Sequence, residues 1–299
     1  MITRRGFLKL VARGVIAAAA LAGYPVVEAM AEPRITSYWL TPPNWTPGLT
    51  LKIVALADFH ACDPWMTVDR IEAICDQANA LKPDIILLLG DYATGMNAVL
   101  AHVHSRDWSR AFASLKAPLG VHAILGNHDY WEDLAYQRDP QLETFGEKAL
   151  RNVGIPVYIN TAVRLEKDGH PFWLAGLGDQ LAMRPGKRFG RHSFIGVNDL
   201  PSTLAQVTDT SPLILMAHEP DIFPAMSPRV ALTLSGHTHG GQVNILGWIP
   251  FSSSRLGRRY PGGHYVENDK NLIVSRGLGC SILPIRLGAW PEILEIDLA

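Results

Sequence analysis

The sequence has only three cysteines among 299 residues, so they cannot all pair with one another. The spacing of Cys62, Cys75 and Cys280 matches no zinc-binding module. We therefore expect all three to be unpaired and structural.

The formal net charge is only -1. That balance gives no electrostatic reason to expect nucleic acid as the main partner, which makes a nuclease a poor hypothesis. The chain also shows no repeat of fixed period and no low-complexity segment.

The N-terminal apolar run, Val15 to Leu21, is too short to span a bilayer as a stable helix. It does fit a targeting segment. Thr3 to Lys9 reads TRRGFLK, which resembles a twin-arginine export signal, and Ala29-Met30-Ala31 offers the small-x-small pattern of a signal-peptidase site. We expect a signal peptide over residues 1–31, either cleaved or kept as a tether, and export by the twin-arginine machinery to the periplasm or the outer face of the cytoplasmic membrane. That route carries proteins already folded. The alternative is an amphipathic N-terminal helix of a cytoplasmic protein.

Residues 32–50 are expected to be an extended lead-in, because the stretch from Pro33 to Pro47 holds four prolines and little periodicity. One folded domain is expected over residues 51–299. Apolar runs of strand length recur along it, at 51–57, 85–89, 121–125, 173–177, 213–217 and 230–234. Helical patterns lie between them, for example at 68–81 after a Thr67 cap, at 142–153 and at 200–207. The alternation indicates an α/β chain, with a strand-rich end from 265 to 298.

Most of these strands deliver a polar residue just past the C-terminal end. The residues are Asp58, Asp91, Asn127, His218 and His237. Ligands bind at that edge of open α/β sheets, where side chains from different strands can converge. Glycines precede three of these positions and permit the sharp turns that aim the side chains. The pattern therefore predicts one shared site.

Considered one at a time, the motifs differ in how specifically they indicate a metal site. Asp58-x-His60 and Gly90-Asp91 occur widely by chance, and a lone His218 is more often a satisfied strand-end histidine than a ligand. Gly126-Asn127-His128-Asp129 and Gly236-His237-Thr238-His239 are more specific. All five motifs occur in order along the chain, and each follows a strand. Together they resemble the calcineurin-like metallophosphoesterases, and the resemblance extends from Leu51 to the C-terminus. With the twin-arginine motif, the resemblance points to an exported bacterial branch. It implies an α/β (α+β) fold of two packed mixed β-sheets flanked by helices, a four-layer sandwich.

The resemblance also implies roles. Asp58, His60 and His239 would hold one metal ion, Asn127, His218 and His237 would hold a second, and Asp91 would bridge both. His128 would approach the phosphate and donate a hydrogen bond or proton to the leaving group, with Asp129 orienting it. A ligand set of oxygen and imidazole nitrogen favours two divalent ions of Mn, Fe or Zn. Such a pair lowers the pKa of a bound water to about 7, so hydroxide is available as the nucleophile.

Other polar and aromatic residues have two interpretations. We expect His102 and His104 to lie at the surface, His122 to be in the core or to support a ligand, and Asp179 to serve a structural turn. Arg255, Arg258 and Arg259 are candidates to contact a phosphate or an anionic lipid headgroup, with a solvated basic loop as the alternative. Trp131, Trp248 and Phe251 either line an apolar substrate groove or pack at its rim.

The leading hypothesis is a metal-dependent phosphohydrolase of the cell envelope that cleaves phosphodiester or pyrophosphate bonds. The substrate would be a phosphate ester, with lipid-linked or cell-wall phosphates suggested by family analogy alone, and with peripheral membrane contact. The alternative is a non-catalytic metal- or cell-wall-binding module that keeps the fold. His128 and Asp129 favour the enzyme, because neither is needed to hold metal.

Overall fold

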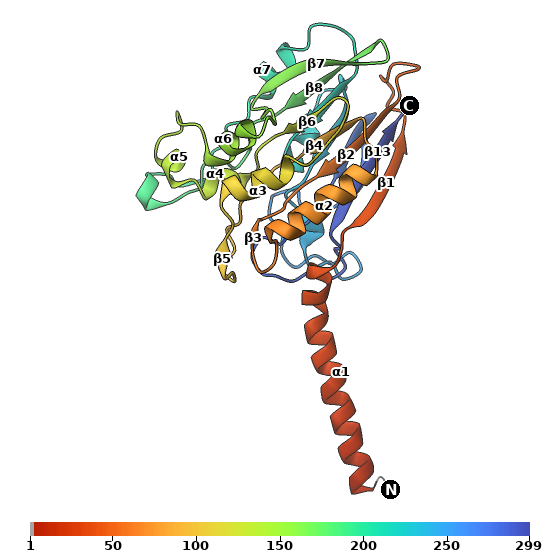
Figure 1. The fold of residues 1–299 in the computed structure, drawn as a ribbon, viewed down its shortest axis with the longest axis vertical. Coiled ribbons are helices and arrows are strands. Elements are labelled where there is room, and N and C mark those ends of the chain that lie inside the picture. Colours follow the sequence, from red (N-terminus) through yellow and green to blue (C-terminus); the bar gives the residue numbers. More distant parts are fainter. Residues whose placement is uncertain (1–2) are drawn as a thin grey trace.

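Two mixed β-sheets form the centre of the computed structural model, which describes residues 3–299 (Figure 1). The five-stranded sheet has the order β1 (Arg34–Leu40), β13 (Glu292–Leu298), β2 (Leu51–Leu56), β4 (Ile85–Leu88) and β6 (Val121–Ala123). The six-stranded sheet has the order β11 (Gly263–Glu267), β12 (Lys270–Val274), β10 (Val230–Ser235), β9 (Leu213–Met216), β8 (His170–Gly176) and β7 (Thr161–Lys167). A short ribbon pairs β3 (Cys62–Asp63) with β5 (Ala101–His102).

Helices cover the outer faces of both sheets. The five-stranded sheet is covered by α2 (Val68–Ala80), α3 (Ser105–Phe112) and α6 (Phe145–Asn152), with α4 (Asn127–Trp131) and α5 (Leu134–Arg138) at its end. The six-stranded sheet packs against α7 (Leu200–Ala205) and the 3-10 turn η2 (Pro220–Ala225), and two more 3-10 turns are η1 (Lys187–Phe189) and η3 (His239–Gly241). The predicted cap of α2 is present, since the Thr67 side chain accepts a hydrogen bond from the Arg70 backbone N–H.

The apolar strands explain the layering, because successive side chains of a strand point to opposite faces. In β2, Ile53 and Ala55 pack between the two sheets, whereas Val54 and Leu56 pack under the helices. A third apolar cluster lies between the six-stranded sheet and its own cover. The order helix, sheet, sheet, helix confirms the predicted four-layer sandwich of two mixed sheets.

The proline-rich segment 32–50 belongs to this architecture more closely than the sequence indicated. Its residues Arg34–Leu40 are extended, but they form β1, which pairs in parallel with β13 over seven register positions. The folded unit therefore includes residues that were expected to precede a domain beginning at position 51. The sequence did not indicate this because the partner strand lies at the other end of the chain.

The first helix, α1 (Arg4–Met30), extends away from the body for most of its length (Figure 1). Its first turn is capped by the Thr3 side chain, and its last residues lie against the domain. Within the described residues, no helix combines the length and apolar character needed to cross a membrane. The three cysteines, all inside the described part of the chain, are buried and free, which confirms that prediction.

Candidate metal centre

Strands from both sheets bring the predicted ligands to one place. Asp58 and His60 follow β2, Asp91 follows β4, and Asn127 begins α4 just after β6. From the six-stranded sheet, His218 follows β9, and His237 and His239 follow β10. All seven of these side chains are buried. Residues as far apart in the sequence as Asp58 and His237, which are separated by 179 positions, therefore share one polar pocket.

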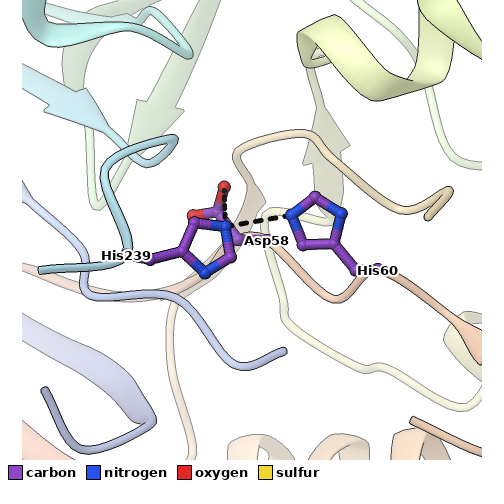
Figure 2. A group of neighbouring side chains, drawn as sticks. All are labelled: Asp58, His60 and His239. Atoms are coloured by element: carbon purple, nitrogen blue, oxygen red, sulfur yellow. Dashed lines mark hydrogen bonds and ion pairs between the residues drawn. The ribbon is translucent and has the colours of Figure 1, made fainter. Parts of the chain in front are cut away.

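One group of three ligands consists of Asp58, His60 and His239 (Figure 2). Nε2 of His60 lies 2.9 Å from Nε2 of His239, and the latter lies 3.6 Å from Oδ1 of Asp58. Figure 2 shows the two imidazole rings and the carboxylate directed at a common point. The geometry therefore suits a single cation held by two nitrogens and one oxygen.

A second group consists of Asp91, His218 and His237. Asn127 joins it, because its Oδ1 lies 2.8 Å from Nδ1 of His237. Oδ2 of Asp91 lies 3.2 Å from Nε2 of His218 and 3.5 Å from Nε2 of His60. The Asp91 carboxylate thus stands between the two groups, as a bridging ligand must.

The chemistry of these donors fits two divalent ions. Burial lowers the pKa of His60 to about 3 and brings the pKa of His239 well below its usual range. Both rings are therefore neutral and available as ligands. The set contains no thiolate, which favours Mn, Fe or Zn over a structural zinc site of cysteines.

Opposite charges dominate the second group. Burial alone would raise the pKa of Asp91, but the neighbouring His218, His128 and His60 hold that pKa well below its usual range. Burial likewise disfavours the cation of His218, yet the Asp91 and Asp58 carboxylates raise the pKa of His218 well above normal. Asp91 and His218 thus form an ion pair, and His218 would have to be deprotonated to serve as a metal ligand.

Backbone groups fix the orientation of the rings. His218 Nδ1 faces the Leu89 carbonyl oxygen at 2.7 Å, and His60 Nδ1 faces the Ala93 carbonyl oxygen at 3.1 Å. A ring that donates from Nδ1 to a carbonyl presents Nε2 to the metal. Five of the seven ligands also adopt the left-handed backbone conformation, with φ of 50° to 69°: Asp58, His60, Asp91, His237 and His239. Such conformations cost of order 1–3 kcal/mol each, and they concentrate at functional sites.

His128 lies at the edge of this centre, where it was expected. Its ring centroid is 4.9 Å from that of His60, and its backbone N–H donates to Oδ1 of Asp91 at 2.8 Å. Nδ1 of His128 lies 3.6 Å from Oε1 of Glu132, one helical turn further along. Burial opposes protonation, but the nearby Asp91 and Glu132 carboxylates raise the pKa of His128 above its usual value. Glu132 was missed, although its i+4 spacing from His128 was a usable signal.

Asp129 does not orient His128, which corrects the role expected for it. Its two carboxylate oxygens accept four backbone N–H groups at 2.9 to 3.0 Å, and the side chain is fully buried. The donors are Asp91, Tyr92, Ala93 and Gly126. Asp129 therefore ties the loop after β4 to the loop after β6. It is a structural residue of the pocket, and it cannot also hold the His128 ring because its oxygens are occupied.

Arg286 is a residue of the centre that the sequence did not reveal. Its guanidinium is fully buried and donates to the backbone carbonyls of Gly279, Arg276 and Ala289. One of its terminal nitrogens lies 3.2 Å from Nδ1 of His239. The residue thus supports the loop behind a predicted ligand. Nothing in the local sequence distinguishes this arginine from a surface one.

The other histidine and aspartate candidates lie outside the metal centre, either at the surface or in structural roles. His102 and His104 are exposed, and His122 is a core histidine bonded to the Tyr158 hydroxyl and the Leu119 carbonyl, each at 2.8 Å. Asp179 serves a turn, since its Oδ1 accepts the Leu181 N–H at 2.7 Å.

Two of the three arginines in the loop over residues 255–259 already have partners within the protein. Arg259 forms an exposed ion pair with Glu267 at 2.8 Å, and Arg258 donates to the Pro250 carbonyl, while Arg255 is exposed. The same loop is tied to the centre by Ser253, which donates to the His237 carbonyl. Phosphate contact by these arginines stays a prediction.

Two adjoining ligand groups around a shared aspartate, at the end of a two-sheet sandwich, define a dinuclear metal-dependent hydrolase. The chain belongs to the calcineurin-like phosphoesterase family, whose model matches residues 51–241. It is 31% identical to the metallophosphoesterase YkuE of Bacillus subtilis, over 83% of this chain and 78% of that protein. It is 30% identical to the phosphodiesterase YaeI of Escherichia coli, over 83% and 82%. A dimetal phosphatase from Danio rerio aligns over 76% of this chain and 88% of its own, with 16% identity and a TM-score of 0.38.

The protein is therefore a metallophosphoesterase that uses two divalent metal ions, which confirms the predicted family, enzyme class and cofactors.

Proposed function

We propose that the protein hydrolyses phosphodiester or pyrophosphate bonds at the cell envelope, and that the twin-arginine machinery exports it. The observation that carries the catalytic part is the Asp91 carboxylate between the two ligand groups, with His128 beside them. When bound, the two ions supply hydroxide at neutral pH and offset charge on the phosphoryl oxygens. Asp58, His60 and His239 would hold one ion, and Asn127, His218 and His237 the other.

His128 is proposed as the proton donor to the leaving group. Its raised pKa keeps the imidazolium populated near neutral pH, and its Nε2 lies 3.4 Å from the Ser281 hydroxyl. A donor must be protonated when the substrate binds, and the Asp91 and Glu132 carboxylates both favour that state. Ser281 is placed to orient the ring. His128 is not needed to hold metal, which supports an enzyme over a non-catalytic binding module.

Apolar side chains near His128 support a lipid-linked substrate and peripheral membrane contact. Ile282 and Leu283 follow Ser281 directly and are 76% and 51% exposed. The Trp131 ring, whose centroid lies 5.0 Å from that of His128, stacks on Phe194 with centroids 5.3 Å apart, and Phe194 is 47% exposed. Exposed apolar groups beside a phosphoryl site suit an amphiphilic ester whose tail lies against them. Trp248 and Phe251, in the loop that follows the last predicted ligands, are also exposed, at 63% and 78%.

The catalytic proposal is tested with bis(p-nitrophenyl) phosphate and Mn²⁺. His128→Ala should lower kcat about 10²- to 10⁴-fold, while the protein still binds two ions by elemental analysis. A wild-type protein that binds two ions but hydrolyses no diester or pyrophosphate would favour the non-catalytic module. The lipid proposal is tested separately with Ile282→Ser/Leu283→Ser. That variant should raise KM for a lipid-linked pyrophosphate and leave KM for the soluble diester unchanged. Val266→Ser, on the exposed face of β11, is the matched control.

A further inference from the structure

The last turn of α1 is built into the domain through two sets of hydrogen bonds. The Pro25 carbonyl accepts the Arg286 backbone N–H at 2.8 Å. The Glu28 carboxylate accepts the backbone N–H groups of Gly288 and Ala289 at 3.1 and 2.9 Å. Glu28 is only 2% exposed, so both oxygens are satisfied inside the protein. A buried carboxylate with such partners is a structural element of the loop that it holds.

Arg70, on α2, also holds this turn. Its guanidinium donates to the carbonyls of Ala29 and Ala31 at 3.0 and 3.2 Å, and to the Trp65 carbonyl. A cation is favourable at these positions because the last carbonyls of a helix have no partner within it. Ala29 is 3% exposed and belongs to an apolar cluster with Met96 and Cys280. Removing the turn would leave Arg70 without the two carbonyl acceptors at Ala29 and Ala31.

The docked turn also reaches the metal centre. Glu28 supports the loop that contains Arg286, and the Arg286 guanidinium lies 3.2 Å from Nδ1 of His239. On the other side, Ala29 and Met30 line a small enclosed cavity together with His60. Two ligands of one ion, His60 and His239, therefore have the end of α1 behind them.

This arrangement conflicts with cleavage at the motif Ala29-Met30-Ala31. A signal peptidase reads small side chains at two positions of that motif, and it needs access to both. In the structure Ala29 and Met30 are helical, and the Ala29 side chain is buried. The twin-arginine route delivers a protein that has already folded, so the motif would reach the peptidase in this docked state. Cleavage would first require the turn to detach from the domain.

We propose that residues 25–31 are a permanent part of the folded domain and that the motif at 29–31 is not cut after export. The helix α1 then stays attached as an N-terminal tether. Its last turn supports the loop behind His239.

The first test is the intact mass of the exported protein. The full chain, with a C-terminal tag, is expressed in a bacterium that has the twin-arginine machinery, and its export is verified by protease access in spheroplasts. The expected result is an exported chain that still contains residues 1–31. An exported chain that begins at Glu32 would overturn the proposal. Because no hydrolysis is measured, this outcome is independent of the proposed activity.

The second test compares Glu28→Ala with Val27→Ala in the same full chain. Val27 lies on the same turn but is 64% exposed. Glu28→Ala should lower the melting temperature by roughly 5 °C and should convert part of the exported protein to the form that begins at Glu32. Val27→Ala should melt like the wild type and stay uncut. If the two variants had the same melting temperature, the proposed structural role of this turn would be refuted. If the chain is not exported, the export proposal fails, and the melting comparison still decides whether the turn is structural.

Discussion

Replacing Asp129 by asparagine should destabilise the protein far more than a change of one charge normally does. The carboxylate accepts four backbone N–H groups, two at each oxygen. Asparagine keeps one acceptor oxygen and turns an NH₂ group toward two N–H donors. Two hydrogen bonds to an ionised acceptor are then lost, each worth about 1.5–3 kcal/mol. The expected loss is roughly 3–6 kcal/mol, because the side chain is fully buried and bulk solvent does not replace these bonds.

The measurement is urea unfolding of wild type and Asp129→Asn, followed by tryptophan fluorescence, with a chelator present so that metal does not contribute. Asp168→Asn is the matched control, since Asp168 lies exposed in the turn between β7 and β8 and should change stability by less than about 0.5 kcal/mol. If Asp129→Asn unfolds at the same urea concentration as wild type while its kcat falls, the residue serves His128 directly. A structural role for Asp129 would then be refuted.

Three further outcomes follow from the site and the sheets. Glu132→Gln removes a charge that raises the pKa of His128, so the alkaline limb of the pH–kcat profile should move to lower pH, as a donor acts only below its pKa. Gly126→Ala would drive a Cβ into the bridging carboxylate, so elemental analysis should find fewer than two ions per chain, whereas Gly146→Ala, which meets only ordinary contacts, should keep both. Lys52 of β2 lowers the pKa of Glu295 on the neighbouring strand, so this pair stabilises the fold at neutral pH. Its contribution is lost as the pH falls below the unfolded glutamate pKa and through the lowered folded pKa. Glu295→Gln should therefore cost less than about 1 kcal/mol at pH 7, and less at pH 3 than at pH 7, by urea unfolding at both values.

The positions of the ligands were predictable because they depend on local signals. Apolar runs of strand length place their last residue at the edge of a sheet, and the next polar residue then faces the ligand-binding side. Asp58, Asp91 and His237 were found in this way. The helix N-cap at Thr67 was also predictable, since a hydroxyl before an amphipathic run satisfies a free N–H.

The supporting groups were not predictable, because their partners are distant in sequence. Arg286 and Asp129 have ordinary neighbours along the chain, and only the folded loops turn their side chains onto backbone groups. The left-handed backbone at His60 and His239 could not be predicted either, since few residues other than glycine adopt it and nothing nearby marks these two. The strand at Arg34–Leu40 escaped notice because its pairing partner begins at Glu292.

The position of β13 has a consequence for synthesis on the ribosome. This strand lies between β1 and β2, and it pairs with both. Thr36 and Glu292, which touch across this seam, are separated by 256 positions. A nascent chain therefore cannot close the sheet until translation has passed the last strand, and β2 presents an open edge until then. Translation that stops before this strand would leave a product with an incomplete sheet, which cellular proteases and chaperones recognise.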